Sequence, residues 1–158
     1  PANGPHDLFA RLAQLQRRIQ TAVCLDESIF TANDLAKALK HQELKCYALK
    51  IGKFGGIQPA LQFVRMANAR GMSVWMGGMY DTGISRRVHA AFQMLPGVVD
   101  AGDIGATSRY FDVDVTDPPY TVERGTVTLE RRGHEHGLGC ALDRSALSRV
   151  LIDQQTYE

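Results

Sequence analysis

The chain has 158 residues, and its 18 lysine and arginine residues against 17 aspartate and glutamate residues give a formal net charge of +1. This balance argues against a nucleic-acid-binding protein, because phosphate contacts need an excess of clustered positive charge. The hydrophobic share of 44% and the charged share of 22% are ordinary for a folded domain and unlike those of a disordered chain. The chain is also too short for a complete eight-stranded α/β barrel, which needs about 250 residues.

The cysteines and the apolar runs indicate the cellular compartment in which we expect the protein. Cys24, Cys46 and Cys140 are odd in number and form no C-x-x-C pair, so they predict neither a disulfide framework nor a zinc site. Cys24 and Cys46 are interpreted as small core residues. No run reaches the roughly 18 apolar residues of a membrane span, and the first residues lack both a methionine and the apolar core of a signal peptide. We expect a cytoplasmic protein without a membrane partner, and a chain that is a piece of something longer.

The first part of the chain predicts a helix, a strand and a second helix. Apolar residues recur at helical spacing over residues 7–20 and predict an amphipathic helix. Residues 21–25 form a short apolar run that ends at Asp26, which is typical of a buried strand. Thr31 and Asp34 have the spacing of a capping box and predict the start of the next helix.

The same alternation continues through three further strands. An apolar run at residues 46–49 and mainly apolar segments at residues 72–76 and 98–102 predict these strands, and they end near Lys50, Gly77 and Asp103 at a nearly constant interval. Between them lie two apolar stripes at helical spacing, Ile57, Leu61 and Val64, and then Val88, Ala91, Phe92 and Leu95. Strands that alternate with helices in this way predict a parallel α/β sheet with right-handed crossovers.

Beyond Asp103 the alternation stops. Polar and apolar residues alternate over residues 120–130 around Arg124-Gly125, which predicts a hairpin. Residues 141–151 predict either a short helix or a strand followed by a helix. The sequence therefore predicts about four βα units, half the strand number of a barrel, and a small appended element.

Parallel α/β proteins bind ligands at the carboxyl ends of their strands, so the residues there are the first candidates for a site. Asp26 and Glu27 could ligate a hard cation such as Mg²⁺, and the alternative is a helix-capping or surface carboxylate. Lys50 could act as a base if burial and a nearby cation lowered its pKa. The alternative is a lysine that extends to solvent at the rim.

Glycines and other polar residues offer weaker signals. Gly77-Gly78-Met79 could present N–H groups to a carboxylate, or could simply form a sharp loop. The glycines of residues 52–56 match no nucleotide-binding loop. Asp103 with Arg109 could belong to a site or form an ordinary surface ion pair. We interpret residues 134–136, His-Glu-His, as a solvated loop, and His89 as a residue on a helix surface or in a loop.

Four segments together resemble the enolase superfamily, and within it the o-succinylbenzoate synthase and N-acylamino acid racemase group of the muconate-lactonizing subgroup. The resemblance covers about the first 115 residues, and the joint pattern is far more specific than any one motif. The segments are Cys24-Leu25-Asp26-Glu27-Ser28, Leu49-Lys50-Ile51-Gly52-Lys53-Phe54-Gly55-Gly56, Trp75-Met76-Gly77-Gly78-Met79-Tyr80-Asp81-Thr82-Gly83 and Gly102-Asp103-Ile104-Gly105-Ala106-Thr107-Ser108-Arg109-Tyr110.

The resemblance implies a fold and a site. Residues 1–115 would form strands five to eight of a modified (β/α) barrel, and residues 116–158 a tail that packs on the barrel and on a capping domain. Asp26 would be the third of three ligands of Mg²⁺, or of Mn²⁺ in its place, with Glu27 as a supporting carboxylate. Lys50 would be one of a pair of catalytic lysines.

The resemblance also implies the chemistry. Such enzymes remove a proton α to a carboxylate and hold the resulting enediolate on Mg²⁺. The implied activity is o-succinylbenzoate synthesis in the menaquinone pathway, and N-acylamino acid racemisation or a muconate cycloisomerase-type reaction is the alternative. A small carboxylate substrate would contact the residues after the third and fourth strands, namely Gly77, Gly78, Met79, Tyr80 and Asp103. The chain departs from the family pattern at Gly52, Asp81 and Ser85, where proline, glutamate and glycine are usual, which softens the substrate assignment.

Two classes of function remain open from the sequence. On the first reading the chain is the C-terminal half of an enzyme, and we expect it to be inactive alone because the other metal ligands, the second lysine and the capping domain lie outside it. On the second reading it is an inactive half-barrel that serves as a binding or assembly module. Open sheet edges would then favour a homo-oligomer or pairing with the missing N-terminal half.

Overall fold

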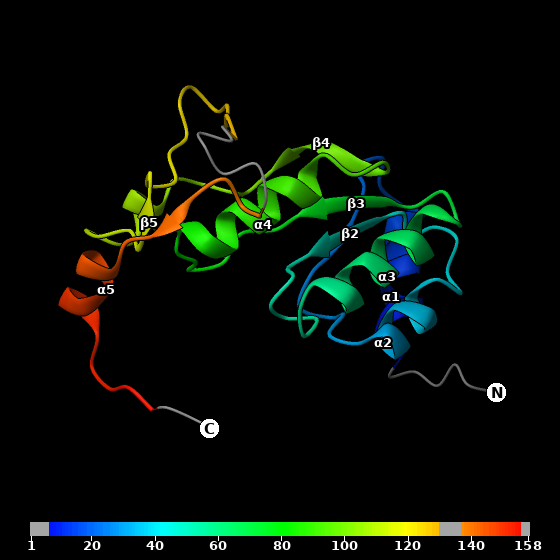
Figure 1. Cartoon of the computed structure of the whole chain (residues 1–158). Coiled ribbons are helices and arrows are strands. Elements are labelled where there is room, and N and C mark those ends of the chain that lie inside the picture. The colour runs from blue at the N-terminus through cyan, green and yellow to red at the C-terminus, as the bar shows by residue number, and fades with distance from the viewer. Residues whose placement is uncertain (1–6, 130–136, 156–158) are drawn as a thin grey trace. The chain divides into compact units, whose positions relative to one another are not determined.

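The fold is described from a computed structural model, which covers residues 7–129 and 137–155 (Figure 1). The chain divides into two compact units. The first contains Pro1–Gly77 and Gln93–Asp103, and the second contains Gly78–Phe92 and Ile104–Glu158. No helix in the described ranges is both long enough and apolar enough to cross a lipid bilayer.

A four-stranded parallel sheet forms the centre of the first unit. Its strands are β1 (Cys24–Leu25), β2 (Cys46–Leu49), β3 (Ser73–Met76) and β4 (Val98–Gly102), and they lie side by side in chain order. The predicted parallel α/β sheet is therefore confirmed. Strand β1 is shorter than predicted because the backbone N–H of Val23 donates to the Gln16 side chain and not to a neighbouring strand.

Three helices belong to the first unit: α1 (Leu8–Gln16), α2 (Ala32–Ala38) and α3 (Ile57–Asn68). The predicted capping box is confirmed, because the Thr31 hydroxyl accepts from the Asp34 N–H while the Asp34 carboxylate accepts from the Thr31 N–H. Helix α1 ends four residues before the predicted end at residue 20. Helix α3 packs against β3, and α2 packs against α3.

The core of the first unit lies between these helices and the sheet. Tyr47 and Leu49 of β2 are fully buried, and the Tyr47 ring meets the Phe63 ring of α3 edge-on. The predicted apolar stripe of α3 is only partly right, because Ile57 is exposed and Leu61 is half-buried. The buried face of α3 consists of Ala60, Phe63, Val64 and Ala67.

The second unit contains α4 (Gly83–Gln93, whose last residue belongs to the first unit), a short 3-10 helix η1 (Thr107–Arg109) and α5 (Arg144–Val150). It also contains an antiparallel pair, β5 (Thr116–Asp117) with β6 (Ala141–Leu142). Residues 141–150 thus form a strand followed by a helix, the second of the two predicted alternatives. The predicted hairpin is present as well, since Glu123 and Thr126 exchange two backbone hydrogen bonds around Arg124 and Gly125.

Helix α4 differs from its prediction in the residues that it buries. Phe92 is buried as expected, but Ala91 is exposed. Arg86 and His89 are buried instead, so the interpretation of His89 as a residue of a helix surface or loop is wrong. The His89 imidazole lies 3.6 Å from the Asp81 carboxylate, and burial lowers the pKa of His89 despite this neighbour.

Candidate functional site

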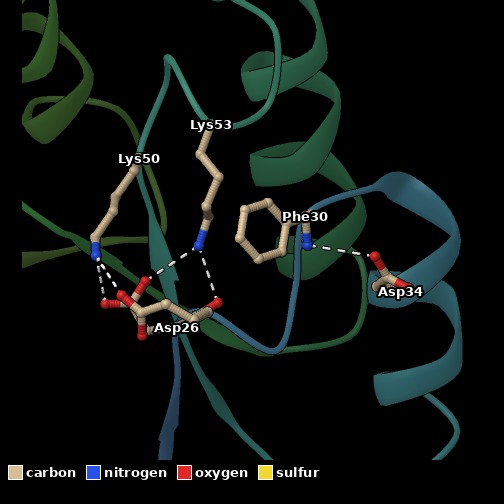
Figure 2. A network of polar contacts seen from close by, with 6 residues as sticks. Asp26, Phe30, Asp34, Lys50 and Lys53 are labelled. Atoms are coloured by element: carbon tan, nitrogen blue, oxygen red, sulfur yellow. Dashed lines mark hydrogen bonds and ion pairs between the residues drawn. The ribbon is translucent and has the colours of Figure 1, made fainter.

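A cluster of charged side chains lies at the carboxyl ends of β1 and β2 in the first unit (Figure 2). Asp26 and Glu27 follow β1 directly, and Lys50 follows β2 directly. Because β1 and β2 are neighbouring parallel strands, their carboxyl ends lie at the same edge of the sheet. The sheet therefore brings together three of the side chains that the sequence singled out.

The contacts within the cluster are short. The Lys50 ammonium lies 2.7 Å from Asp26 Oδ2 and 3.0 Å from Glu27 Oε1. The Lys53 ammonium lies 3.1 Å from Asp26 Oδ1 and donates to the Asp26 backbone carbonyl at 2.9 Å. Both oxygens of the Asp26 carboxylate are thus engaged by lysines, as Figure 2 shows.

Sequence reasoning did not predict Lys53 as a site residue. Its side chain is only 7% exposed, and its ammonium lies 5.2 Å from the centre of the Phe30 ring and 5.6 Å from that of Phe54. Both distances are within the range of a cation–π contact. The sequence offered one signal, which is that Lys53 follows Lys50 by three residues. The chain turns between them, and the Lys53 N–H donates to the Lys50 carbonyl.

The electrostatics of the cluster follow from these contacts. Burial alone would raise the pKa of Asp26, but hydrogen bonds and charges from Lys50 and Lys53 outweigh it and lower this pKa. Burial alone would lower the pKa of Lys50, but Asp26 and Glu27 outweigh it and raise this pKa. The hydrogen bond from Lys50 also lowers the pKa of Glu27, whose side chain is 72% exposed. These pKa shifts favour Lys50 as a cation and Asp26 and Glu27 as anions at neutral pH.

Gly77 follows β3 and lies against the Lys50 side chain. A Cβ atom at position 77 would lie 2.9 Å from Lys50 Cε and 3.2 Å from Lys50 Cγ. Glycine therefore leaves the space in which the Lys50 side chain runs toward Asp26. Gly77 was predicted as a substrate-contacting residue, and within this unit the side chains nearest to a Cβ at this position are those of Lys50 and Trp75. Asp103 is exposed directly after β4, and its backbone N–H donates to the Met76 carbonyl.

The other residues predicted to contact substrate belong to the second unit. Gly78 is half-buried, whereas Met79 and Tyr80 are exposed. The Tyr80 ring meets the Tyr110 ring edge-on, with 4.9 Å between the ring centres.

The buried Arg86 side chain holds this loop in place. Its guanidinium donates to the carbonyls of Met79, Asp81 and Gly105. It also lies 5.3 Å from the centre of the Tyr110 ring. Arg86 thus connects the segment before α4 to the segment before η1, a role that the pattern of apolar residues in α4 did not indicate.

The carboxylates of the cluster are of the chemical kind that binds a hard cation, but the cluster offers only Asp26 and Glu27. Asp26 and Glu27 offer the oxygen atoms that Mg²⁺ prefers. Lys50 and Lys53 now occupy both Asp26 oxygens, and a cation would have to replace at least one of them. In residues 7–129 and 137–155, histidine, cysteine, aspartate and glutamate side chains form no group of three or more that could hold a metal. Residues 134–136 lie outside these ranges.

Comparisons with known proteins place this geometry in a family. Residues 1–146 match the family described as Enolase C-terminal domain-like. The chain is 36% identical over 148 residues to an o-succinylbenzoate synthase of Enterococcus faecalis, which covers 94% of this chain and 39% of that protein. It is 32% identical over 143 residues to an o-succinylbenzoate synthase of Bacillus subtilis, covering 90% of this chain and 38% of that protein.

Other similarities extend the comparison. An N-succinylamino acid racemase of Amycolatopsis is 40% identical over 106 residues, covering 67% of this chain and 29% of that protein. A solved structure of an enolase superfamily member from Enterococcus faecalis matches with a TM-score of 0.80 and 36% identity, over 90% of this chain and 38% of that one. The muconate lactonizing enzyme of Pseudomonas putida matches with a TM-score of 0.76 and 24% identity, over 87% of this chain and 37% of that one, which shows a shared fold.

The chain thus spans about two fifths of the length of the first two relatives. Its four parallel strands are the C-terminal half of a TIM-type barrel, as the sequence predicted. The match over residues 1–146 covers more than nine tenths of the chain, and the chain belongs to the Enolase C-terminal domain-like family.

Proposed function

We propose that this chain carries Asp26 and Lys50 of an active site that removes a proton α to a carboxylate, in an enzyme of the o-succinylbenzoate synthase type. One observation carries the proposal: the Lys50 ammonium lies 2.7 Å from Asp26 Oδ2, at the edge of a parallel sheet where such enzymes bind substrate. The similarity to two o-succinylbenzoate synthases supports the same chemistry.

Each residue of the cluster would have a distinct role. Lys50, only 12% exposed and held as a cation, would stabilise the negative charge that develops when the α-proton leaves. Asp26 would supply one carboxylate ligand to Mg²⁺ or Mn²⁺, with Glu27 in support. When bound, the metal ion would neutralise charge on the substrate carboxylate. Lys53 would act as a positioning residue, because its two contacts fix the orientation of Asp26.

A second candidate is the racemisation of an N-succinylamino acid. The 40% identity to the Amycolatopsis racemase favours it, although the match covers fewer residues of this chain than those to the two synthases. In a racemase, Lys50 would also give or accept a proton at Nζ.

We further propose which residues contact the substrate, namely Gly77, Gly78, Met79, Tyr80 and Asp103. We also propose that residues 1–115 form the barrel part of the enzyme and residues 116–158 the tail.

The proposal is tested in a chimera. The C-terminal 39% of the Enterococcus faecalis synthase, the part that matches this chain, is replaced by the chain. We expect Mg²⁺-dependent formation of o-succinylbenzoate, measured by absorbance, and a loss of at least about 100-fold in kcat on Lys50→Ala. Exchange of the α-proton of N-succinylamino acids in D₂O, followed by NMR, assays the second candidate in the same protein.

Matched variants separate chemistry from folding. Lys40→Ala removes an exposed lysine and should leave kcat within about twofold, since surface substitutions of this kind change little. Circular dichroism and thermal unfolding establish that the chimera and its variants are folded. A folded, active chimera in which Lys50→Ala changes neither reaction by more than twofold contradicts the proposal.

A further inference from the structure

Two cysteines lie side by side as the first residues of β1 and β2. Cys24 and Cys46 are direct partners in the register of these parallel strands. Cys24 is exposed and Cys46 is partly exposed, so the interpretation of Cys24 as a core residue is wrong. Both are free thiols, as is Cys140 in the second unit. The proposed chemistry assigns no role to either Cys24 or Cys46.

The strand register places the two cysteines directly opposite each other on neighbouring strands. Neighbouring strands lie about 4.8 Å apart, and disulfides join Cα atoms about 4.4 to 6.8 Å apart. Directly paired residues of neighbouring strands also point their side chains to the same face of the sheet. The Cα spacing of this register pair is therefore in the range that disulfides join.

We propose that Cys24 and Cys46 form a thiol-modification site, at which a low-molecular-weight disulfide converts the pair reversibly into a disulfide between β1 and β2. In the first step, one of the two cysteine sulfurs loses its proton to solvent and attacks one sulfur of the small disulfide. A mixed disulfide forms, and one small thiol leaves with a proton.

In the second step, the other cysteine of the pair loses its proton and attacks the cysteine sulfur of the mixed disulfide. The bond between Cys24 and Cys46 forms, and the second small thiol leaves. Two electrons pass from the protein to the small disulfide, and two protons end on the two released thiols. An excess of a dithiol reverses both steps. The product joins the two strands that carry Asp26 and Lys50.

The test treats the whole 158-residue chain with oxidised glutathione under native conditions, followed by acid quenching, blocking of free thiols and tryptic digestion. The three cysteines fall in different tryptic peptides, at residues 19–37, 46–50 and 133–144. We expect mass spectrometry to find the first two peptides joined and the third blocked as a free thiol. Reduction with dithiothreitol should separate them again.

The rate of disulfide formation in the denatured chain is the reference for the rate in the native chain. Loop closure alone favours the pairing of Cys24 with Cys46, because fewer residues separate these two than separate either from Cys140. The same reaction in denaturing urea measures that contribution. If the strands position the thiols, the Cys24–Cys46 disulfide should form at least about tenfold faster in the native chain than in urea. Equal rates in the two conditions would contradict the proposal.

Single variants give the second readout. In Cys46→Ser, the mixed disulfide on Cys24 has no partner and should accumulate with one glutathione per chain. Cys140→Ser should react as the original chain does. Native chains that carry separate glutathione adducts on Cys24 and Cys46, or that join either residue to Cys140, would overturn the proposal. No step needs a metal ion or a substrate, so the result is independent of the proposed enzymatic function.

Discussion

At the scale of single residues, Asp26 is held between two ammonium groups (Figure 2). The Lys50 and Lys53 side chains are only 12% and 7% exposed, so both lysines are largely buried. A largely buried ammonium is stable only when it is paired and hydrogen-bonded. The cluster is therefore coupled, and the removal of one member changes the environment of the others.

The contribution of Lys53 can be measured in the Lys53→Met variant, which keeps the aliphatic volume and removes the charge. We expect the free energy of unfolding to fall by about 1.5 to 3 kcal/mol, because a hydrogen bond to a charged group is lost. Lys40→Met, at an exposed position, should change it by less than about 0.5 kcal/mol. Urea unfolding followed by circular dichroism compares the two. Equal effects of both variants would show that Lys53 has no such role.

The lowered pKa of Asp26 predicts a dependence of stability on pH. Because folding lowers this pKa below its ordinary value of 3.8, the folded chain binds the proton less readily than the unfolded chain does. Asp26 thus contributes stability that is fully present above 3.8 and is lost as pH falls through the lowered pKa. In metal-free buffer, the free energy of unfolding of Asp26→Asn should fall less steeply on acidification below about pH 4 than that of the original chain.

Asp112→Asn is the matched control for this pH dependence. Asp112 is exposed and has no ion pair or side-chain hydrogen bond among the contacts described. Because the substitution changes an exposed side chain, this variant should stay within about 0.5 kcal/mol of the original chain. If the acid dependence of Asp26→Asn coincides with that of the original chain, the Asp26 carboxylate is not the group whose protonation destabilises the fold.

At the scale of elements, the sequence predicted the bounds of two strands correctly. The bounds of β2 and β4 agree with the segments predicted at residues 46–49 and 98–102. Strand β1 was predicted too long because the Gln16 side chain binds both the Val23 N–H and the Thr21 carbonyl. A contact between a side chain and a backbone several residues away has no signature in hydrophobic periodicity.

The buried polar residues of α4 show a second limit. Arg86 is buried because three backbone carbonyls accept from its guanidinium, and two of them precede the helix while the third follows β4. The sequence can indicate that position 86 lies on a helix, but hydropathy assigns arginine to the surface. The pairing of β5 with β6 was missed for a similar reason, since each strand has only two residues and offers no periodicity.

Gly77 gives a prediction about the junction between β3 and the charged cluster. A methyl group at position 77 would meet Lys50 Cε at 2.9 Å, and Lys50 cannot move freely because Asp26 and Glu27 hold its ammonium. We expect Gly77→Ala to lower the free energy of unfolding by about 1 to 3 kcal/mol, the usual cost of overpacking. In the chimera it should lower kcat as well, because the Lys50 ammonium is displaced.

Gly52→Ala is the control for Gly77→Ala. A Cβ atom at position 52 would meet nothing within 4 Å, and its backbone is outside the left-handed region. This variant should therefore unfold within about 0.5 kcal/mol of the original chain and keep the activity of the chimera. If Gly77→Ala and Gly52→Ala behave alike in both measurements, the Lys50 side chain does not depend on the space that Gly77 leaves.

At the scale of the whole molecule, the family could be predicted from four short segments at the ends of the strands. The sheet could be predicted from the alternation of strands and helices along the chain. What the segments could not indicate is how the charges of the site neutralise one another within this chain. Asp26 matches a metal-ligand position in the resemblance, yet here its two oxygens contact Lys50 and Lys53. The predicted boundary near residue 115 stays a prediction.

These contacts lead to a prediction about metal binding by the chain itself. A Mg²⁺ ion at Asp26 would have to displace at least one of two ammonium groups that are paired and largely buried. Mg²⁺ also gives up its own water reluctantly and needs several oxygen ligands. We therefore expect isothermal titration calorimetry to give no saturable heat for Mg²⁺ with the 158-residue chain, or with its Asp26→Ala variant.

The chimera should behave differently, because the barrel half of the synthase supplies further ligands if the proposed function is right. There, Asp26→Ala should raise the Mg²⁺ concentration needed for half-maximal activity, while Asp112→Ala should leave it unchanged. Saturable binding to the chain alone that disappears in Asp26→Ala would contradict the prediction, since it would mean that Mg²⁺ displaces the lysines without help. Substrate assays of the chain alone would then be the next experiment, because a half-barrel that holds the metal ion could also bind a carboxylate.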